Sequence, residues 1–136
     1  MKRTITVLLV ACVLIFSSLT VASASMSDII APMADNYRSV YADLKITSGE
    51  ATVSAKMNGK IGITTKVTIH LYLQQYKDGK WVDHDDWTKT EKGVNCTLSE
   101  TVSVPKGYTY RAKASCYAYA GSKSEHVIKY SAEVKY

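Results

Sequence analysis

Hydrophobic and polar residues alternate with a period of two over most of the chain beyond residue 43. The clearest run is Val67, Ile69, Leu71 and Leu73, interleaved with Thr68, His70 and Tyr72. This alternation is typical of half-buried strands, which turn one face to a core and the other to solvent. Segments with the same pattern cover residues 44–46, 51–57, 67–73, 81–87, 94–104, 108–116 and 128–136. The chain is therefore predicted to be all-β, with about seven short strands and no helix.

Turn signals separate these segments. Asn58-Gly59 and Pro105-Lys106-Gly107 predict turns, and Asp78-Gly79 predicts a tight hairpin. Short strands with turn signals between them are typical of a β-sandwich or small barrel. We expect residues 44–136 to form one sandwich domain.

Residues 25–43 lack a sustained apolar pattern. They are expected to form an extended or disordered lead-in to the sandwich. Tyr37, Val40 and Tyr41 at its end are candidates for joining the first strand.

The start of the chain has the three parts of a signal peptide. Lys2 and Arg3 precede an apolar stretch from Ile5 to Leu19, and Ala22-Ser23-Ala24 offers a small-x-small cleavage site. We expect residues 1–24 to be removed and the mature protein to be secreted, without a membrane span. A transmembrane anchor and lipidation at Cys12 are the alternatives.

Charge narrows the range of partners. The chain has 17 basic and 12 acidic side chains, a net charge of +5. Removing Lys2 and Arg3 leaves 15 minus 12, or +3, on the mature chain. This mild excess suits weak attraction to anionic polymers. No clustered run of basic residues is present, and export makes nucleic acid an unsuitable partner.

Cys96 and Cys116 are the cysteines that remain in the mature chain. Two cysteines in an exported protein predict a disulfide. They lie symmetrically about Lys106, so they would be opposite one another in a hairpin. They would also face each other across the core if the chain turned a sandwich corner there. Either geometry would allow the bond.

Residues 83–86, Asp-His-Asp-Asp, are the densest cluster of metal-ligating side chains. Two carboxylates on one strand face fall short of the six or more oxygens of a calcium site. A solvated edge strand, protected by its charges from aggregation, is the favoured interpretation. Trp81 and Trp87 flank the cluster and share its phase, but a bulge between them would send one or both into the core.

The chain has ten tyrosines, several of them in the polar phase of their strands. Exposed tyrosines provide rigid contact area at low entropic cost, although they also simply favour strands. If the third strand pairs with the sixth, one outer surface would carry a candidate binding face made of Tyr72, Arg111, Lys113, Tyr117 and Tyr119.

Two resemblances follow from particular residues. The segment Val104-Pro105-Lys106-Gly107, followed by Tyr110-Arg111-Ala112-Lys113-Ala114, resembles the corner before the sixth strand of immunoglobulin and fibronectin type III sandwiches. That resemblance implies an immunoglobulin-like sandwich in which Tyr110 hydrogen-bonds back to the corner. The stretch 75–81, Trp87 and residues 107–111 resemble an uncharacterised family of small exported proteins of Gram-positive bacteria, which implies no activity.

No catalytic, cofactor or metal motif stands out in the sequence. His70, His84 and His126 are too scattered to predict a triad. We therefore expect a non-enzymatic binding module with an extracellular or cell-envelope partner, such as a glycan or protein. A secreted bacteriocin-like antagonist of other bacteria is the alternative, and a small hydrolase is the third hypothesis.

Overall fold

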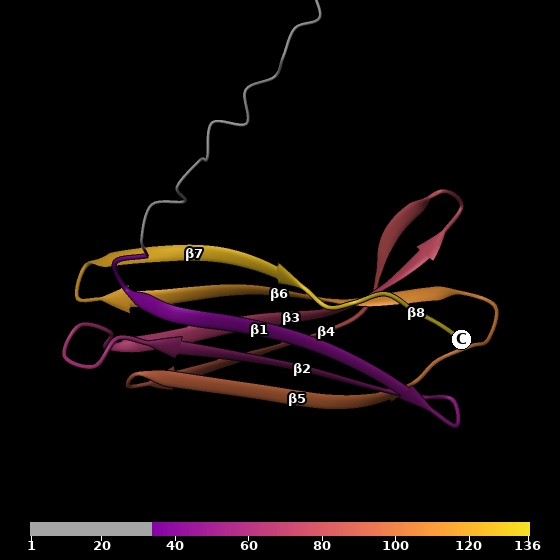
Figure 1. Ribbon diagram of the computed structural model, residues 1–136, viewed down its shortest axis with the longest axis horizontal. Helices are drawn as coiled ribbons and strands as arrows, with labels where there is room; N and C mark the ends of the chain where they lie inside the picture. Colours follow the sequence, from indigo (N-terminus) through magenta and orange to yellow (C-terminus); the bar gives the residue numbers. More distant parts are fainter. Residues whose placement is uncertain (1–33) are drawn as a thin grey trace, which may run out of the picture. The chain divides into compact units, whose positions relative to one another are not determined.

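The computed structural model describes residues 34–136. Within them the chain forms strands only (Figure 1). The strands are β1 (Tyr37–Thr47), β2 (Glu50–Gly59), β3 (Lys66–Lys77), β4 (Lys80–Lys92), β5 (Asn95–Ser103), β6 (Thr109–Ala120), β7 (Lys123–Tyr130) and β8 (Val134–Lys135). The predicted signal peptide, its cleavage site and the lipidation alternative at Cys12 lie outside the described residues.

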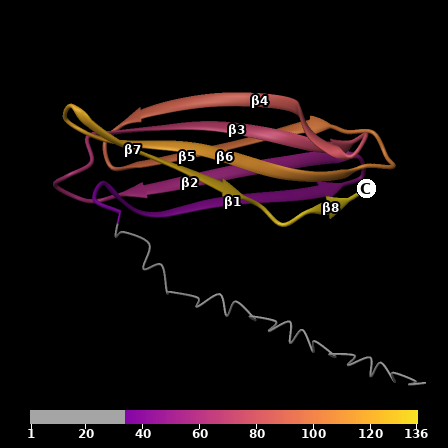
Figure 2. The same ribbon diagram turned by 90° about the horizontal axis from the view of Figure 1, so that it is seen from above.

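The strands form two antiparallel sheets packed as a β-sandwich, which confirms the predicted fold class. One sheet has the order β1-β2-β5, and the other has the order β4-β3-β6-β7, with β8 also paired to β6. Figure 2 shows the sheets stacked, with β3 and β4 in one layer and β1 and β2 in the other. β3 pairs with β6, as expected for an immunoglobulin-like order.

The fourth strand distinguishes this sandwich from an immunoglobulin constant domain. There the fourth strand pairs in the sheet of the first, second and fifth strands. Here β4 pairs with β3 along its whole length and extends the other sheet instead. This placement widens the β4-β3-β6-β7 sheet and gives it a broad outer surface.

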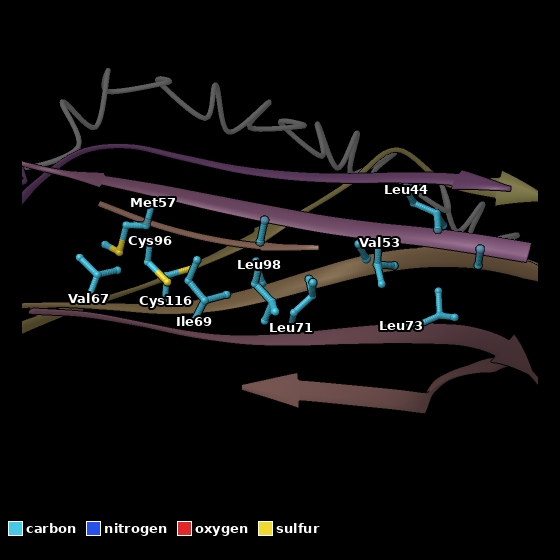
Figure 3. Packing of buried hydrophobic residues seen from close by; sticks show 14 of the residues in the cluster. Leu44, Val53, Met57, Val67, Ile69, Leu71, Leu73, Cys96, Leu98 and Cys116 are labelled. Atoms are coloured by element: carbon cyan, nitrogen blue, oxygen red, sulfur yellow. The ribbon is translucent and has the colours of Figure 1, made fainter. Parts of the chain in front are cut away.

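The core lies between the sheets and follows the predicted alternation on the central strands. Val67, Ile69, Leu71 and Leu73 of β3 are fully buried. They pack against inward residues of β2 and β5, including Val53, Met57 and Leu98 (Figure 3). On β6 the inward positions after Tyr110 are small: Ala112, Ala114, Cys116 and Ala118, all fully buried.

The Tyr110 corner has the hydrogen bond that the resemblance implied. The Tyr110 hydroxyl donates to the Pro105 carbonyl oxygen at 2.7 Å and accepts from Gln75 Nε2 at 3.1 Å. Burial raises the pKa of the Tyr110 phenol, so the hydroxyl keeps the proton that it donates. The corner thus ties the 104–108 turn to β6 and, through Gln75, to β3.

Two hairpin turns have the backbone that a tight two-residue turn requires. Asp78 and Gly79 have φ of 53° and 79°, and Ser48 and Gly49 have φ of 52° and 82°. Positive φ at both central residues is the mark of a type I′ turn, whose twist matches that of the flanking strands. The hairpin predicted at Asp78-Gly79 is confirmed.

The turn predicted at Asn58-Gly59 is wrong. β2 continues through Gly59, and the connection to β3 is the loop 60–65. Gly59 is needed there for space rather than for a turn, since an added Cβ would lie 2.4 Å from Thr64 Oγ1. Asn58 pairs with the neighbouring strand and donates from Nδ2 to Ser39 Oγ at 2.9 Å.

The first strand begins at Tyr37, inside the segment 25–43 that was expected to be a lead-in. The sandwich therefore starts before residue 44. Val40, Ala42 and Ile46 are partly buried against the core, in phase with the buried Leu44. The alternation was hard to see in the sequence because small and polar residues interrupt it.

The last predicted strand, 128–136, is in fact two strands with a break at Ser131. Ser131 Oγ accepts a hydrogen bond from Ala112 N at 2.8 Å and donates to Ala132 O at 2.8 Å. A side chain thus replaces a backbone partner in the ladder, and the phase changes across it. Ile128 and Tyr130, predicted to face inward, are consequently on the outer face, 43% and 44% exposed.

Candidate functional site

The outer face of the β4-β3-β6-β7 sheet carries all five residues of the predicted binding face. Tyr72 on β3 is paired directly with Lys113 on β6. Arg111, Tyr117 and Tyr119 lie along the same side of β6, because they alternate with its buried alanines. The structure therefore brings together residues that the sequence placed on two strands.

Arg111 is held at one end of this face by two aromatic rings. Its guanidinium carbon lies 4.2 Å from the ring centre of Trp81 on β4 and 4.2 Å from that of Tyr130 on β7. Its Nε donates to Gln74 Oε1 at 2.9 Å, and Gln74 Nε2 donates to Asp83 Oδ1 at 2.9 Å. Stacking on both sides and one hydrogen bond fix the direction of the guanidinium.

The middle of the face is formed by Lys113 and Tyr72. The Lys113 Nζ lies 5.3 Å from the centre of the Tyr72 ring, within the range of a cation–π contact. Tyr130 is the partner of Lys113 on the other side, in β7. Lys113 thus lies between two tyrosine positions on neighbouring strands.

The other end of the face is an aromatic cluster around Tyr117. The ring of His126 on β7 stacks on Tyr117 at 4.4 Å, with 15° between the planes. The Tyr119 ring also stacks on Tyr117, with 6.4 Å between the ring centres. The His70 ring meets Tyr117 edge-on at 5.8 Å. The Lys66 Nζ lies 4.1 Å from the centre of the Tyr119 ring. Here too, a cation and several rings hold one another in place.

We call this surface the aromatic–cationic face. It comprises Lys66, Tyr72, Trp81, Arg111, Lys113, Tyr117, Tyr119, His126 and Tyr130. Sequence reasoning missed Lys66, Trp81, His126 and Tyr130 as members. Tyr130 is on this face only because the phase changes between β7 and β8, whereas Trp81 is placed there by its pairing with Tyr76 beside the Asp78-Gly79 hairpin.

β4 contains a bulge between the two tryptophans, one of the arrangements that the sequence left open. Leu73 pairs with Asp85 while its neighbour Gln74 pairs with Asp83, so His84 has no partner in β3. The extra residue puts the two tryptophans on opposite faces. Trp87 packs partly buried against the core, whereas Trp81 lies on the outer face over Arg111.

The acidic cluster at residues 83–86 lies on an edge strand, since β4 ends its sheet. Asp83 is engaged by Gln74, and the Asp85 carboxylate accepts a hydrogen bond from Asp86 N at 2.9 Å. Within residues 34–136, no group of three or more His, Cys, Asp or Glu side chains could hold a metal ion. The same part of the chain has no helix long and apolar enough to cross a membrane.

Cys96 and Cys116 are free, buried thiols in the structure, so the predicted disulfide is absent from it. The hairpin geometry is wrong because Cys96 lies on β5 and Cys116 on β6, in different sheets. Figure 3 shows their side chains pointing toward one another across the core. Burial, reinforced by the neighbouring Cys96, raises the pKa of the Cys116 thiol to about 12. The disulfide stays a prediction for the exported protein.

A shallow pocket of about 380 Å³ adjoins the Arg111 end of the face, lined by Tyr76, Trp81, Thr109 and Glu133. The Tyr76 and Trp81 rings lie 5.2 Å apart and are tilted by 60°. The pocket extends the aromatic surface beyond Arg111 and adds one carboxylate at its border.

Comparison with known proteins gives no functional assignment. No protein-family model and no curated protein matches the chain. The solution structure of CsgH from R. palustris is similar over 71% of this chain and 92% of its own, with 10% identity and a TM-score of 0.38. A crystal structure of a protein from Archaeoglobus fulgidus is similar over 72% of this chain and 94% of its own, with 14% identity and a TM-score of 0.37. Likenesses this distant assign neither a family nor a function.

Proposed function

We propose that this chain is an exported, non-enzymatic binding module whose aromatic–cationic face binds an anionic polymer of the cell envelope. The observation that carries the proposal is the double stacking of Arg111 between Trp81 and Tyr130, continued along the sheet by Lys113 and the Tyr117 cluster. Rings and cations follow one another along the outer side of β6. Solubility alone does not require so many paired aromatic rings on the outer surface of a sheet.

The face is prepared for binding because its side chains already hold one another. Arginine and lysine lose about 2 kcal/mol of rotamer freedom when they are immobilised, and here stacking has already restricted them. Binding then costs less ordering entropy, which favours affinity. Tyrosine and tryptophan add rigid contact area with few rotatable bonds.

Arg111 supports an anionic target in particular. Its Nε is taken up by Gln74, but within residues 34–136 neither terminal nitrogen of the guanidinium has a hydrogen-bond or ion-pair partner. These two nitrogens form the planar fork that binds carboxylates and phosphates in a bidentate manner. The stacking rings hold that fork at the surface.

The charges also indicate where the target would lie. Lys66, Arg111 and Lys113 are on β3 and β6, whereas Asp83 and Asp86 border the face on β4. A polyanion would therefore lie along β6 and β7, away from the acidic edge. Charge would mainly raise the association rate, and aromatic contact area would supply most of the affinity.

The test compares binding to purified cell walls and to arrays of acidic glycans. Tyr117→Ser/Tyr119→Ser removes two rings of the face. Tyr41→Ser is the matched control, because Tyr41 is a tyrosine 59% exposed on the other sheet. We expect the double variant to bind at least about tenfold more weakly, equivalent to about 1.4 kcal/mol, and the control to bind like wild type.

Near-ultraviolet circular dichroism first shows that each variant is folded. Lys113→Gln should weaken binding mainly at low ionic strength, because salt screens an exposed charge. If wild type binds a target and the folded double variant binds it equally well, the proposed face plays no part. Binding to a protein instead of an acidic polymer would refute the proposed target class.

A further inference from the structure

The loop 60–65 between β2 and β3 presents two isoleucines to solvent. Ile61 is 82% exposed and Ile63 is 46% exposed. In Figure 1 the loop is the magenta turn at the left end of the sandwich. It adjoins the Tyr119 end of the aromatic–cationic face, since Thr65 N donates to Tyr119 O, whereas Arg111 pairs with Gln74 farther along β3. Isoleucine is among the residues most often buried, and short surface loops usually carry polar residues. Two exposed isoleucines on one loop therefore indicate a contact surface.

The loop is held in shape by hydrogen bonds. The backbone nitrogens of Ile63 and Thr64 both donate to Lys60 O, at 3.1 and 2.9 Å. Lys60 N donates to Thr64 Oγ1 at 2.8 Å, and Thr64 Oγ1 donates to Asn36 O. Gly62, with φ of 81°, allows the bend between the two isoleucines. The loop is fixed with its apolar side chains outward, so they do not fold back onto the core.

Cations surround this apolar tip. Arg38 lines the hollow beside Ile61, and Lys60 and Lys123 line the one beside Ile63. Lys66 and Lys92 are paired at the same end of the sandwich. Two acids also lie there, Asp35 and Glu125. The Glu125 carboxylate already accepts hydrogen bonds from the backbone nitrogens of Asp35 and Asn36, at 2.8 and 2.6 Å.

We infer that this tip, Ile61 and Ile63 with the cations around them, inserts into the surface of an anionic lipid bilayer. Apolar side chains enter the boundary between headgroups and acyl chains, while lysine and arginine meet the negative surface. A protein partner fits less well, because two residues on a narrow tip are far fewer than the 20 to 30 residues per side of a specific interface. The expected attachment is weak and reversible, which suits a module that also binds a polymer with another face.

Co-sedimentation with lipid vesicles tests the inference, using the processed chain recovered from the medium of the producing cells. Vesicles of phosphatidylglycerol mixed with phosphatidylcholine should retain the protein, and pure phosphatidylcholine should retain much less. Each cation near an anionic surface contributes about fivefold to partitioning. Arg38→Gln/Lys123→Gln should therefore lower the partition coefficient by about one order of magnitude or more.

Ile61→Ser/Ile63→Ser is the decisive variant and should lower partitioning by at least about tenfold. Ile128→Ser is its matched control, because Ile128 is 43% exposed on the outer face of β7, away from the loop. This substitution should leave partitioning unchanged. Equal partitioning of wild type and Ile61→Ser/Ile63→Ser would overturn the inference. So would a wild type that does not sediment with the anionic vesicles, or that sediments equally with phosphatidylcholine alone. Tyr117→Ser/Tyr119→Ser should still bind vesicles, which separates the tip from the aromatic–cationic face.

Discussion

Tyr110→Phe removes a single oxygen from the corner between β5 and β6, where the chain passes from one sheet to the other. That oxygen donates to Pro105 O at 2.7 Å and accepts from Gln75 Nε2 at 3.1 Å. The ring remains, so hydrophobic packing is preserved and only the polar contacts are lost. The variant therefore isolates what the hydroxyl contributes to stability.

The expected cost follows from those two contacts. A hydrogen bond within a protein contributes about 1 kcal/mol net, and a buried donor left without a partner costs about 1–3 kcal/mol. Gln75 is only 6% exposed, so its Nε2 would have little access to water. Within the described residues no buried side-chain polar atom lacks a partner, and this variant would create one. The sum is a loss of about 2–4 kcal/mol in the free energy of unfolding.

Urea unfolding followed by tryptophan fluorescence measures this loss directly. In thermal unfolding the midpoint should fall by about 10 °C, since 1 kcal/mol corresponds to about 4 °C or more in a domain of this size. Tyr108→Phe is the control, because the Tyr108 hydroxyl has no hydrogen-bond partner within residues 34–136. The control should change stability by less than about 0.5 kcal/mol. A Tyr110→Phe variant as stable as the Tyr108→Phe control would refute the role assigned to the corner.

Four further predictions test other parts of the account. Ser131→Ala should lower stability by about 1–2 kcal/mol in urea unfolding, because the buried Ala112 N would lose its acceptor. The exported protein should weigh two hydrogens less than its reduced form, through a Cys96–Cys116 disulfide; alkylation of both thiols in native, unreduced protein would exclude the bond. In the reduced protein the free energy of unfolding should fall as pH rises from 9.0 toward about 12. Burial raises the pKa of Cys116 to about 12 in the folded state, so over this range the thiol ionises in the unfolded state but stays protonated in the folded one. N-terminal sequencing of secreted protein should begin at or within a few residues of Ser25, whereas a lipid-modified Cys12 in the membrane fraction would contradict the signal peptide.

Sequence reasoning succeeded where a strand keeps one phase from end to end. From Val67 to Leu73 on β3 and from Tyr110 to Ala118 on β6 every second residue is apolar, both strands are central in their sheet, and each of these inward positions is buried. The Tyr110 corner could be predicted as well, because its residues are contiguous. A pattern within one contiguous segment predicts which side chains are buried without knowledge of the neighbouring strands.

The sequence failed where phase or register depends on neighbouring strands. The bulge at His84 turns Trp87 inward, and the break at Ser131 puts Tyr130 on the outer face; the position of neither irregularity can be read from the chain. Tyr130 contributes one of the two rings that contact Arg111. The candidate face could thus be predicted along β6 but not across the sheet.

The most direct test of the proposed function is to map binding on the protein by NMR. Amide signals of the isotope-labelled domain would be recorded while an acidic cell-wall polymer is added. We expect the largest shifts on β3, β6 and β7, around Tyr72, Lys113 and Tyr117, with the β1-β2-β5 sheet little affected. Shifts confined to the β1-β2-β5 sheet, or none with a polymer that the protein demonstrably binds, would contradict the aromatic–cationic face as the binding site.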